Sequence, residues 1–316
     1  MPLHSDVHID RPLSNFAVKY KNEAFIAQAL APFVPVMHKS DKYITFTQKD
    51  GYTVPETIRG PKDTANEVDW STSSSTYGCV DHAIREFISD AIVENSDPAI
   101  MPRQRTTEML TDLLMLDFEI DIATLTTTAG NYGANYKTTL SGGDQWSAHA
   151  TSDPMTNVQT GKDACFKEPN TIVMGKTVWT TLRQHPQILD RVSGGSTNFN
   201  PARVTPELVA ELFEVDNLYI GKAKKNDTNK AQTASFTDVW GDFVVIAYVE
   251  QQPTLDGCCA WKTFLWNQLA TNLGYQVRTY RDESRGGGGE FIEVETSRDS
   301  KVICADVAYL ISDLVA

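Results

Sequence analysis

A long polar stretch, residues 42–90, separates a short apolar segment from a strongly periodic helical region. It opens with a strand-like run at residues 43–46 and closes with another at residues 77–88, where bulky side chains stand beside threonine and other polar residues. Between these runs, glycine, proline and serine leave too few apolar side chains to build a core. Because an isolated two-stranded hairpin is only marginally stable in water, such a stretch needs a neighbour to lie on. We interpret it as an arm that reaches another copy of the same protein.

The composition limits the kinds of protein that this chain can be. Its 316 residues can bury one large core or two modest ones. Asp and Glu total 41 against 28 Lys and Arg, a net charge of −13, which argues against a chain-wide grip on nucleic acid but not against its enclosure. The first residues lack the basic and apolar parts of a secretory signal, and no apolar run approaches the roughly 18 residues of a membrane span. We expect a protein made in the cytosol.

The strongest periodic signal lies at residues 103–127. Apolar residues recur there at steps of three and four on two adjoining stripes, which predicts one long helix, on the order of 35 Å, with a wide buried face. The first stripe contains Met109, Leu113, Leu116, Ile120 and Ala123, and the second contains Leu110, Leu114, Phe118, Ile122 and Leu125. Replacing Leu113 by Asp is therefore expected to prevent folding. Five carboxylates are expected to form an exposed acidic side: Glu108, Asp112, Asp117, Glu119 and Asp121.

After Pro169 short strands and helices alternate, which predicts an α/β half. Thr205 followed by Pro206 supplies the N-cap and first residue of a helix. The nearly unbroken apolar run at residues 243–249 predicts a strand covered on both faces. Other strands are expected at residues 171–174, 218–220, 261–266, 275–283, 291–296 and 302–314, and another helix at residues 176–184. Residues 129–168, rich in Gly, Ser and Asn, are expected to form a loop region.

Motifs for nucleophilic or phosphate chemistry are missing from the sequence. No serine has a GxSxG elbow, no GxxxxGK[ST] loop occurs, and the six histidines form no HExxH or HxH site. His185 precedes Pro186 at a helix break and is interpreted as a helix-end residue. The glycine run at residues 286–289 leads into a strand, so it is interpreted as a hairpin tip. The five cysteines contain no CxxC pair and are interpreted as thiols in a reducing compartment: Cys79, Cys165, Cys258, Cys259 and Cys304.

Two clusters of charged residues are candidate sites. Glu108, Asp112, Asp117 and Asp121 could hold a metal ion, but no histidine interleaves with them at ligand spacing, so a solvated acidic face is favoured. The only dense basic patch is predicted either to solvate a loop or to contact an acidic neighbour; it contains Lys222, Lys224, Lys225 and Lys230. We therefore predict no catalytic, cofactor-binding or metal-binding residues, and no cofactor.

The order of these segments resembles the major capsid proteins of tailed bacteriophages. Residues 16–35 are similar to that family's N-terminal entry, and residues 43–46 with residues 59–70 to its extended loop. Residues 103–127 resemble its spine helix. The start of its axial domain is similar to three places in this chain: residues 169–174, residues 182–185 and Arg191. The resemblance covers nearly the whole chain.

The resemblance implies an α+β Hong Kong 97-like capsid fold. Its expected parts are an N-terminal arm and entry segment at residues 1–40, an extended β-hairpin loop (E-loop) at 41–90, a peripheral domain with the spine helix at 91–168, an α/β axial domain at 169–272, a long peripheral β-hairpin at 273–300, and a C-terminal strand returning to the axial domain at 301–316.

The resemblance also implies a structural function without catalysis. Copies would assemble into pentamers and hexamers of an icosahedral shell that encloses double-stranded DNA without sequence-specific binding. Expected partners are other copies, a portal and a separate scaffolding protein, because the arm begins almost at Met1 unless a segment is removed earlier. No membrane partner is expected, and the location is the virion capsid, assembled in the host cytoplasm. Some members cross-link Lys to Asn; Lys62 lies in the loop, but no distinctive partner predicts that chemistry here.

Three alternatives remain open at this stage. One keeps the fold as an encapsulin-like cellular compartment loaded with enzyme cargo. Another is a soluble α/β enzyme whose site lies after Pro169 and uses His185, Asp190 or a cysteine. The third is a tail-tube or other non-shell virion protein.

Overall fold

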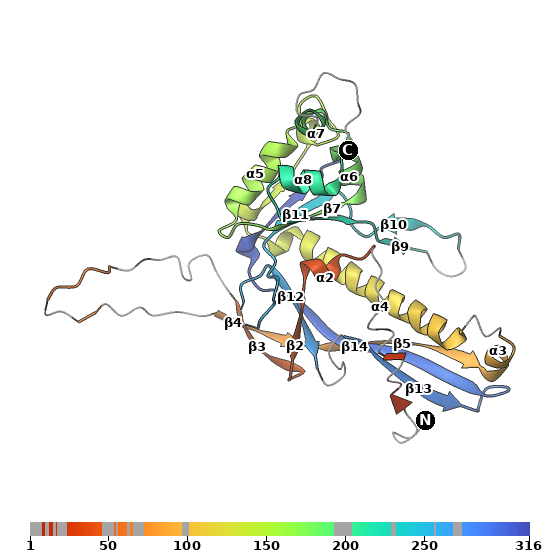
Figure 1. The fold of residues 1–316 in the computed structure, drawn as a ribbon. Coiled ribbons are helices and arrows are strands. Elements are labelled where there is room, and N and C mark those ends of the chain that lie inside the picture. Colours follow the sequence, from red (N-terminus) through yellow and green to blue (C-terminus); the bar gives the residue numbers. More distant parts are fainter. Residues whose placement is uncertain are drawn as a thin grey trace.

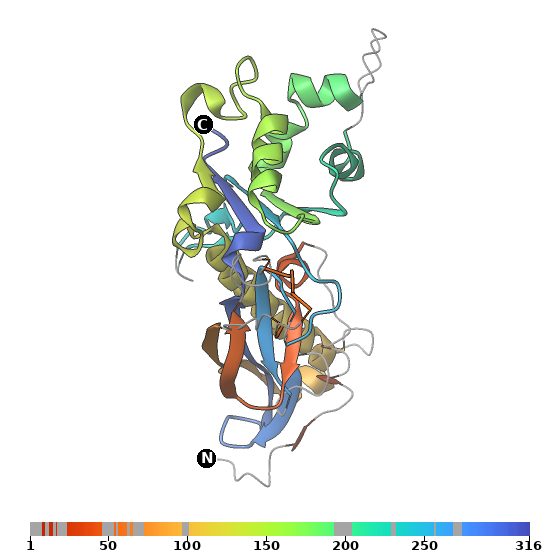
Figure 2. The same cartoon turned by 90° about the vertical axis from the view of Figure 1, so that its left-hand side faces the viewer.

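The molecule has two lobes bridged by one long helix (Figures 1 and 2). The computed structural model describes residues 8–9, 13–14, 17, 24–45, 54, 56–61, 64–65, 73–96, 101–192, 204–228, 232–255, 257–267 and 274–316. The lower lobe is built on a six-stranded sheet and the upper lobe on a five-stranded sheet. Among the helices described, none is both long and apolar enough to cross a membrane.

The lower sheet is organised around its longest strand, β14. It contains β1 (His8–Ile9), β2 (Phe33–Val36), β5 (Val80–Ser89), β12 (Trp261–Trp266), β13 (Gln276–Asp282) and β14 (Gly289–Val302). The order is β1-β13-β14-β12-β2, and β5 also pairs with β14. The hairpin expected at residues 275–283 and 291–296 is present, but its second strand runs on to Val302, where it pairs with β12. The hairpin is thus the middle of a sheet.

Helix α4 (Pro102–Thr127) packs against β14 and β5, at the place where the sequence predicts a long helix. Only one of the two expected stripes is buried there. Leu110, Leu114, Phe118 and Ile122 are at most 4% exposed. The prediction for the other stripe is wrong in its first half, because Met109 and Leu113 are 51% and 50% exposed. The buried face is widened instead by threonines, whose hydroxyls donate to carbonyls one turn earlier: Thr107, Thr111 and Thr126.

Glu119 also departs from the expected acidic exposed side, since it is fully buried. Its carboxylate accepts hydrogen bonds from the amides of Ile26 and Ala27, at 3.0 and 2.7 Å, at the start of α2 (Ala27–Leu30). It also accepts from Nε1 of Trp240 at 2.6 Å. Burial raises the pKa of Glu119, while these bonds to the ionised form oppose the rise. A single carboxylate therefore ties the entry segment and the chain before β11 (Phe243–Ala247) to α4.

The upper lobe packs helices against a sheet in the order β6-β15-β11-β7-β8. Its elements are β6 (Lys137–Thr139), β7 (Thr171–Gly175), β8 (Asn217–Gly221), β11, β15 (Ala308–Ser312), α5 (Pro154–Ala164), α6 (Lys176–Leu182), α7 (Pro186–Val192) and α8 (Pro206–Leu212). Strand β11 is buried nearly throughout, and the hydroxyl of Thr205 caps α8 by accepting from the amide of Leu208. Both features agree with the sequence.

Residues 129–168 correct the sequence interpretation, because they are more than a loop. They supply β6, which pairs parallel with β15, and α5, which packs against β11 and β15. Asp153 caps α5 by accepting from the amide of Thr156 at 3.2 Å, and Pro154 follows it. That Asp–Pro signal was available in the sequence. The chain therefore enters the upper lobe well before Pro169; short connecting elements are α3 (Asp90–Glu94), η2 (Ala129–Asn131), η3 (Ala134–Tyr136), η4 (Gly142–Asp144) and η5 (Ala305–Val307).

The arm begins as a two-stranded hairpin of β3 (Ser40–Thr45) and β4 (Ser73–Gly78). Tyr43 and Tyr77 anchor its base, with ring centroids 5.2 and 4.5 Å from that of Phe264 in β12. The single strand expected at residues 77–88 is divided, because β4 ends at Gly78 and β5 leaves the hairpin for the lower sheet. The described residues 56–61 lie far to one side of both lobes (Figure 1).

Candidate assembly surfaces

An apolar groove runs along the exposed stripe of α4. Met109, Leu113 and Leu116 form one wall, and Ala24 and Phe25 contribute from the entry segment. The opposite side and rim carry Lys222, Ala223, Lys224 and Asp112, and the groove encloses about 280 Å³. Exposed apolar surface beside a charged rim is typical of a protein contact. The groove is thus a surface that another chain can cover.

The predicted basic patch forms one side of this groove. Lys224 and Lys225 lie in β9 (Lys224–Asn226), which pairs with β10 (Phe236–Asp238) in a hairpin beside α4 (Figure 1). Their ammonium groups lie 3.5 Å from Asp238 and 3.2 Å from Asp227. Lys230 lies outside the described residues. The lysines therefore pair with acidic groups of their own chain.

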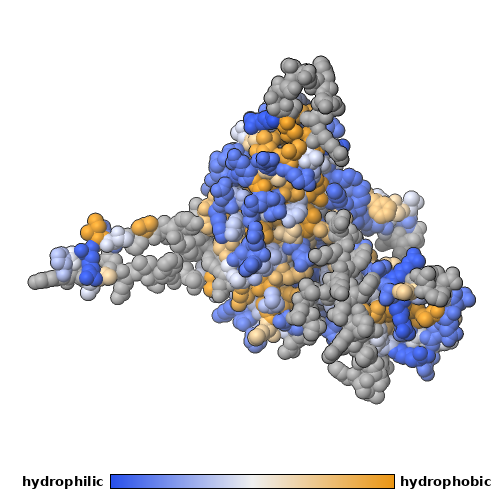
Figure 3. Space-filling model, in the orientation of Figure 1, coloured by the Kyte–Doolittle hydropathy of each residue, from blue (hydrophilic) through white to orange (hydrophobic). Residues whose placement is uncertain are grey.

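The arm carries the second exposed apolar surface. Val54 and Ile58 are 83% and 82% exposed, and Figure 3 shows apolar patches on the arm, away from the main body. The arm and the β9–β10 hairpin lie on opposite sides of the molecule (Figure 1). A protruding apolar segment on one side and an apolar groove on the other are surfaces that could meet in a head-to-tail contact between copies. Lys62, in the same arm, lies outside the described residues.

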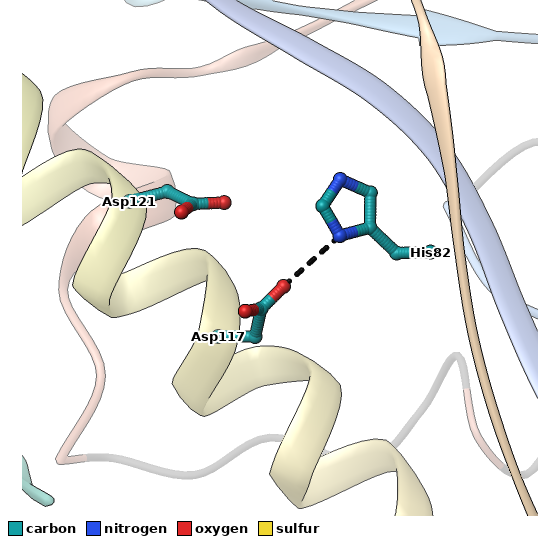
Figure 4. A group of neighbouring side chains, drawn as sticks. All are labelled: His82, Asp117 and Asp121. Atoms are coloured by element: carbon teal, nitrogen blue, oxygen red, sulfur yellow. Dashed lines mark ion pairs between the residues drawn. The ribbon is translucent and has the colours of Figure 1, made fainter.

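One charged cluster joins α4 to the lower sheet. His82 Nδ1 lies 3.1 Å from Asp117, and Asp121 stands one turn further along α4 (Figure 4). These are the only three metal-ligand groups that come close enough to share an ion in the part of the chain described. Sequence spacing missed His82 because it comes from β5. Glu108 and Asp112 do not join the cluster.

An arginine already occupies these carboxylates. One guanidinium nitrogen of Arg298 lies 2.7 Å from Asp117 and 2.8 Å from Asp121, and the Arg298 side chain is only 3% exposed. A cation would have to displace this buried positive charge, so the residues fit an ion-pair network better than a metal centre. The network stabilises the contact of α4 with β14 and β5.

The enzyme alternative depends on His185, which is fully buried against Ser152 with 3.0 Å between His185 Nε2 and the hydroxyl. The amide of Gln187 donates to His185 Nδ1 at 3.3 Å, which places the ring proton on Nε2. The Ser152 hydroxyl in turn donates to the carbonyl of Ala148 at 2.9 Å. A histidine that donates to the serine cannot act as its base. The pair is a structural hydrogen-bond chain.

Asp190 and two of the cysteines also have surroundings that do not suit catalysis. Asp190 is exposed on α7. Burial raises the pKa of the Cys79 thiol to about 11 and that of Cys165 to about 12, which keeps both thiols protonated and unreactive at neutral pH. The glycine run forms the β13–β14 turn, where Gly287 and Gly288 have φ of +89° and +73°, as its interpretation as a hairpin tip requires.

Comparison with known proteins shows which family this chain resembles. The major capsid protein of Pseudomonas phage JBD67 is 30% identical to this chain over 310 residues, which are 98% of this chain and 97% of the relative. This chain belongs to the phage major capsid proteins. The sequence profile of the family described as phage major capsid protein E matches residues 121–264 of this capsid protein. The capsid protein is therefore a structural component of the virion shell, which confirms the resemblance seen in the sequence.

Solved structures identify the fold as the Hong Kong 97-type capsid fold. A phage-related protein from Bordetella bronchiseptica RB50 aligns with a TM-score of 0.75 at 22% identity over 97% of each chain. The capsid of cyanophage P-SCSP1u aligns with a TM-score of 0.56 at 12% identity, over 93% of this chain and 89% of that one. The SrpI encapsulin of Synechococcus elongatus aligns with a TM-score of 0.53 at 11% identity, so the fold alone does not separate phage capsids from encapsulins. The sequence relationship to phage capsid proteins does.

Proposed function

We propose that copies of this capsid protein assemble through their arms into pentamers and hexamers, which close into an icosahedral shell around double-stranded DNA. The observation that carries this proposal is the placement of an exposed apolar arm on one side of the molecule and an apolar groove on the other. A head-to-tail contact between two different surfaces generates a closed ring when its rotation closes. Rings of five and six copies are the units that an icosahedral shell requires.

In each ring, the arm of one copy lies over its neighbour and places Ile58 and Val54 against Met109 and Leu113 of the groove. Fully burying one such side chain contributes about 1.5–3 kcal/mol. The contact repeats around the ring, so modest pairwise terms support a stable assembly. The charged rim, with Asp112 and Lys222 on opposite sides, fixes the direction in which an arm can lie.

We assign the upper lobe to the axial domain at the centre of each ring and the lower lobe to the peripheral domain. The predicted ranges then change, because residues 129–168 supply strand and helix to the upper lobe and β12 lies in the lower sheet. Supporting this division, the last strand, β15, pairs with β11 in the upper lobe, while β13 and β14 lie in the lower lobe. The net charge of −13 supports enclosure of DNA without tight binding to it. A portal and a separate scaffolding protein complete the proposed assembly, which takes place in the host cytoplasm.

Electron microscopy and sedimentation velocity on the purified protein test this proposal. We expect closed shells, or free rings of five or six copies. Deleting residues 51–72 should leave a folded protomer, judged by circular dichroism, that no longer assembles. A wild-type protein that stays monomeric under all assembly conditions would overturn the shell, and normal particles from the deletion variant would overturn the role of the arm.

A further inference from the structure

Two cysteines that the sequence leaves without a role lie against each other near the junction of the lobes. Cys258 precedes β12 and Cys304 follows β14, and their thiols share a hydrogen bond. The amides of Ile303 and Cys304 both donate to the carbonyl of Ala260, at 3.0 and 3.4 Å, so the two backbones are held together at this point. Cys304 is 1% exposed and Cys258 is half-buried. Cys258 is therefore the more exposed residue of the pair.

The remaining cysteines do not share this arrangement, although all five lie in the described chain. The thiols of Cys79, Cys165 and Cys259 each donate to a backbone carbonyl. Among the described cysteines, the thiol-to-thiol contact is that of Cys258 with Cys304.

The surroundings of Cys258 favour its thiolate. The hydrogen bond from Cys304 lowers the pKa of Cys258 to about 7, assisted by the positive charges of Lys167 and Lys262, and correspondingly raises the pKa of Cys304. Lys262 is fully buried, and its ammonium donates to the carbonyls of Thr254 and Gly257 at 2.5 and 2.6 Å. The thiolate is the reactive form of cysteine, so these neighbours favour reaction at Cys258.

Glu250 lies close to the loop that carries Cys258. A Cβ added at Gly257 would lie 1.9 Å from a carboxylate oxygen of Glu250, so the Glu250 side chain would have to move aside. Glu250 in turn lies 3.8 Å from the Lys262 ammonium.

We propose that Cys258 and Cys304 form an intrachain disulfide when the capsid protein meets a small disulfide oxidant, such as oxidised glutathione. The Cys258 thiolate attacks one sulfur of the oxidant, whose S–S bond breaks and releases one glutathione thiolate. Cys304 then gives up its proton and attacks the Cys258 sulfur of the mixed disulfide, which releases the second glutathione. Two protein thiols are oxidised and one small disulfide is reduced to two thiols, so atoms and electrons balance.

The bond would connect the chain just before β12 to the chain just after β14. Those strands pair with each other in the lower sheet, and both lead towards the upper lobe. A cross-link there restricts the unfolded chain and stabilises the folded one. The thiols stay reduced in a reducing cytosol and meet oxidants when a particle leaves the cell. The reaction needs only the folded chain, so its test is separate from that of shell assembly.

Mass spectrometry after treatment with oxidised glutathione tests the proposal on the full-length protein. We expect a linked peptide joining Cys258 and Cys304 under non-reducing conditions, and a melting temperature higher by about 5 °C than that of the reduced protein. Cys79→Ser, which removes a buried thiol elsewhere, should behave like wild type. Cys258→Ser should give neither the link nor the shift. Iodoacetamide at neutral pH should label Cys258 before the other four cysteines.

Three results would overturn the proposal. Stable glutathionylation of Cys258 without closure to Cys304 would show that the second thiol cannot reach it. A link from Cys304 to Cys165 or Cys259 would identify a different pair. Equal oxidation of wild type and Cys258→Ser would show that Cys258 takes no part in the reaction.

Discussion

The arm and helix α4 place their apolar side chains in opposite environments. In α4, Leu110 and Leu114 are buried within the protomer, and only the neighbouring stripe with Leu113 is left exposed. In the arm, Val54 and Ile58 are exposed, and no described part of the protomer covers them. The difference separates residues that stabilise one chain from residues available to join two. Four predictions test that separation, beginning with the largest expected effect.

Adjacent leucines of α4 should respond differently to the same change. Leu114→Asp places a charge where the side chain is 3% exposed, so we expect a loss of several kcal/mol and an unfolded protomer. Leu113→Asp, at a position 50% exposed, should leave the protomer folded and weaken assembly. Thermal unfolding and sedimentation velocity on both variants measure this. Similar instability in the two variants would mean that the exposed stripe also belongs to the protomer core.

A charge exchange between arm and groove should restore what each single change removes. Ile58→Lys and Leu113→Asp should each reduce the fraction of protein in particles about tenfold, because each leaves a charge against an apolar surface. The double variant should recover part of that fraction, since the two charges then face each other. Thr57→Lys, on the same arm, is the matched control. If the loss in the double variant is instead the sum of the two single losses, the arm does not contact this groove.

Glu119→Gln should destabilise the protomer by about 2 kcal/mol, measured by denaturant unfolding. The carboxylate accepts hydrogen bonds from three donors. In glutamine, one carboxylate oxygen is replaced by an amide nitrogen, which cannot accept a hydrogen bond from the donors beside it. Glu108→Gln on the same helix should change stability by no more than about 0.5 kcal/mol. Equal effects of the two substitutions would show that the bonds of Glu119 do not hold the lobes to α4.

The smallest effect concerns pH and Glu295 of β14. Its side chain is 8% exposed and lies beside Arg278 of the neighbouring strand β13. Burial raises the pKa of Glu295 from 4.5 to about 7, against the opposing charge of Arg278. The folded state therefore holds this proton more tightly than the unfolded chain. Its contribution to stability is complete below about pH 4.5 and is lost as the pH rises to about 7.

Glu295→Gln cannot ionise, so the free energy of unfolding of the variant should fall less between these pH values, by about 1–3 kcal/mol. Glu293→Gln, two residues earlier on the same strand, serves as the control. Unfolding midpoints measured at pH 4.5, 6 and 8 give the comparison. Parallel pH profiles for wild type and Glu295→Gln would place the titration elsewhere.

Periodicity in the sequence was sufficient to find α4 and the buried strand β11, because both depend on spacing along one element. It could not decide which stripe of α4 is buried, since that depends on where β14 and β5 lie. It could not separate Glu119 from Asp121 either, because Trp240 and Ala27 reach Glu119 from distant segments.

The side-chain clusters could not be predicted from the sequence for the same reason. His82 meets Asp117 only because β5 pairs with β14 beneath α4. Cys258 meets Cys304 only because β12 pairs with β14. Helix α5 is different, because Asp153 and Pro154 are a local signal for a helix start. The glycine-rich sequence around them favours a loop instead. Capsid family and fold, by contrast, followed from the order of segments along the chain.

The bonds of Glu119 have a mechanical consequence for a shell. Turning the upper lobe relative to α4 strains the bond from Trp240, and lifting the entry segment strains those from Ile26 and Ala27. These bonds therefore resist a change of angle between the lobes and α4. In the proposed shell, copies around a five-fold and a six-fold axis need different tilts, and we expect the arm to absorb that difference while the joint at Glu119 keeps one setting.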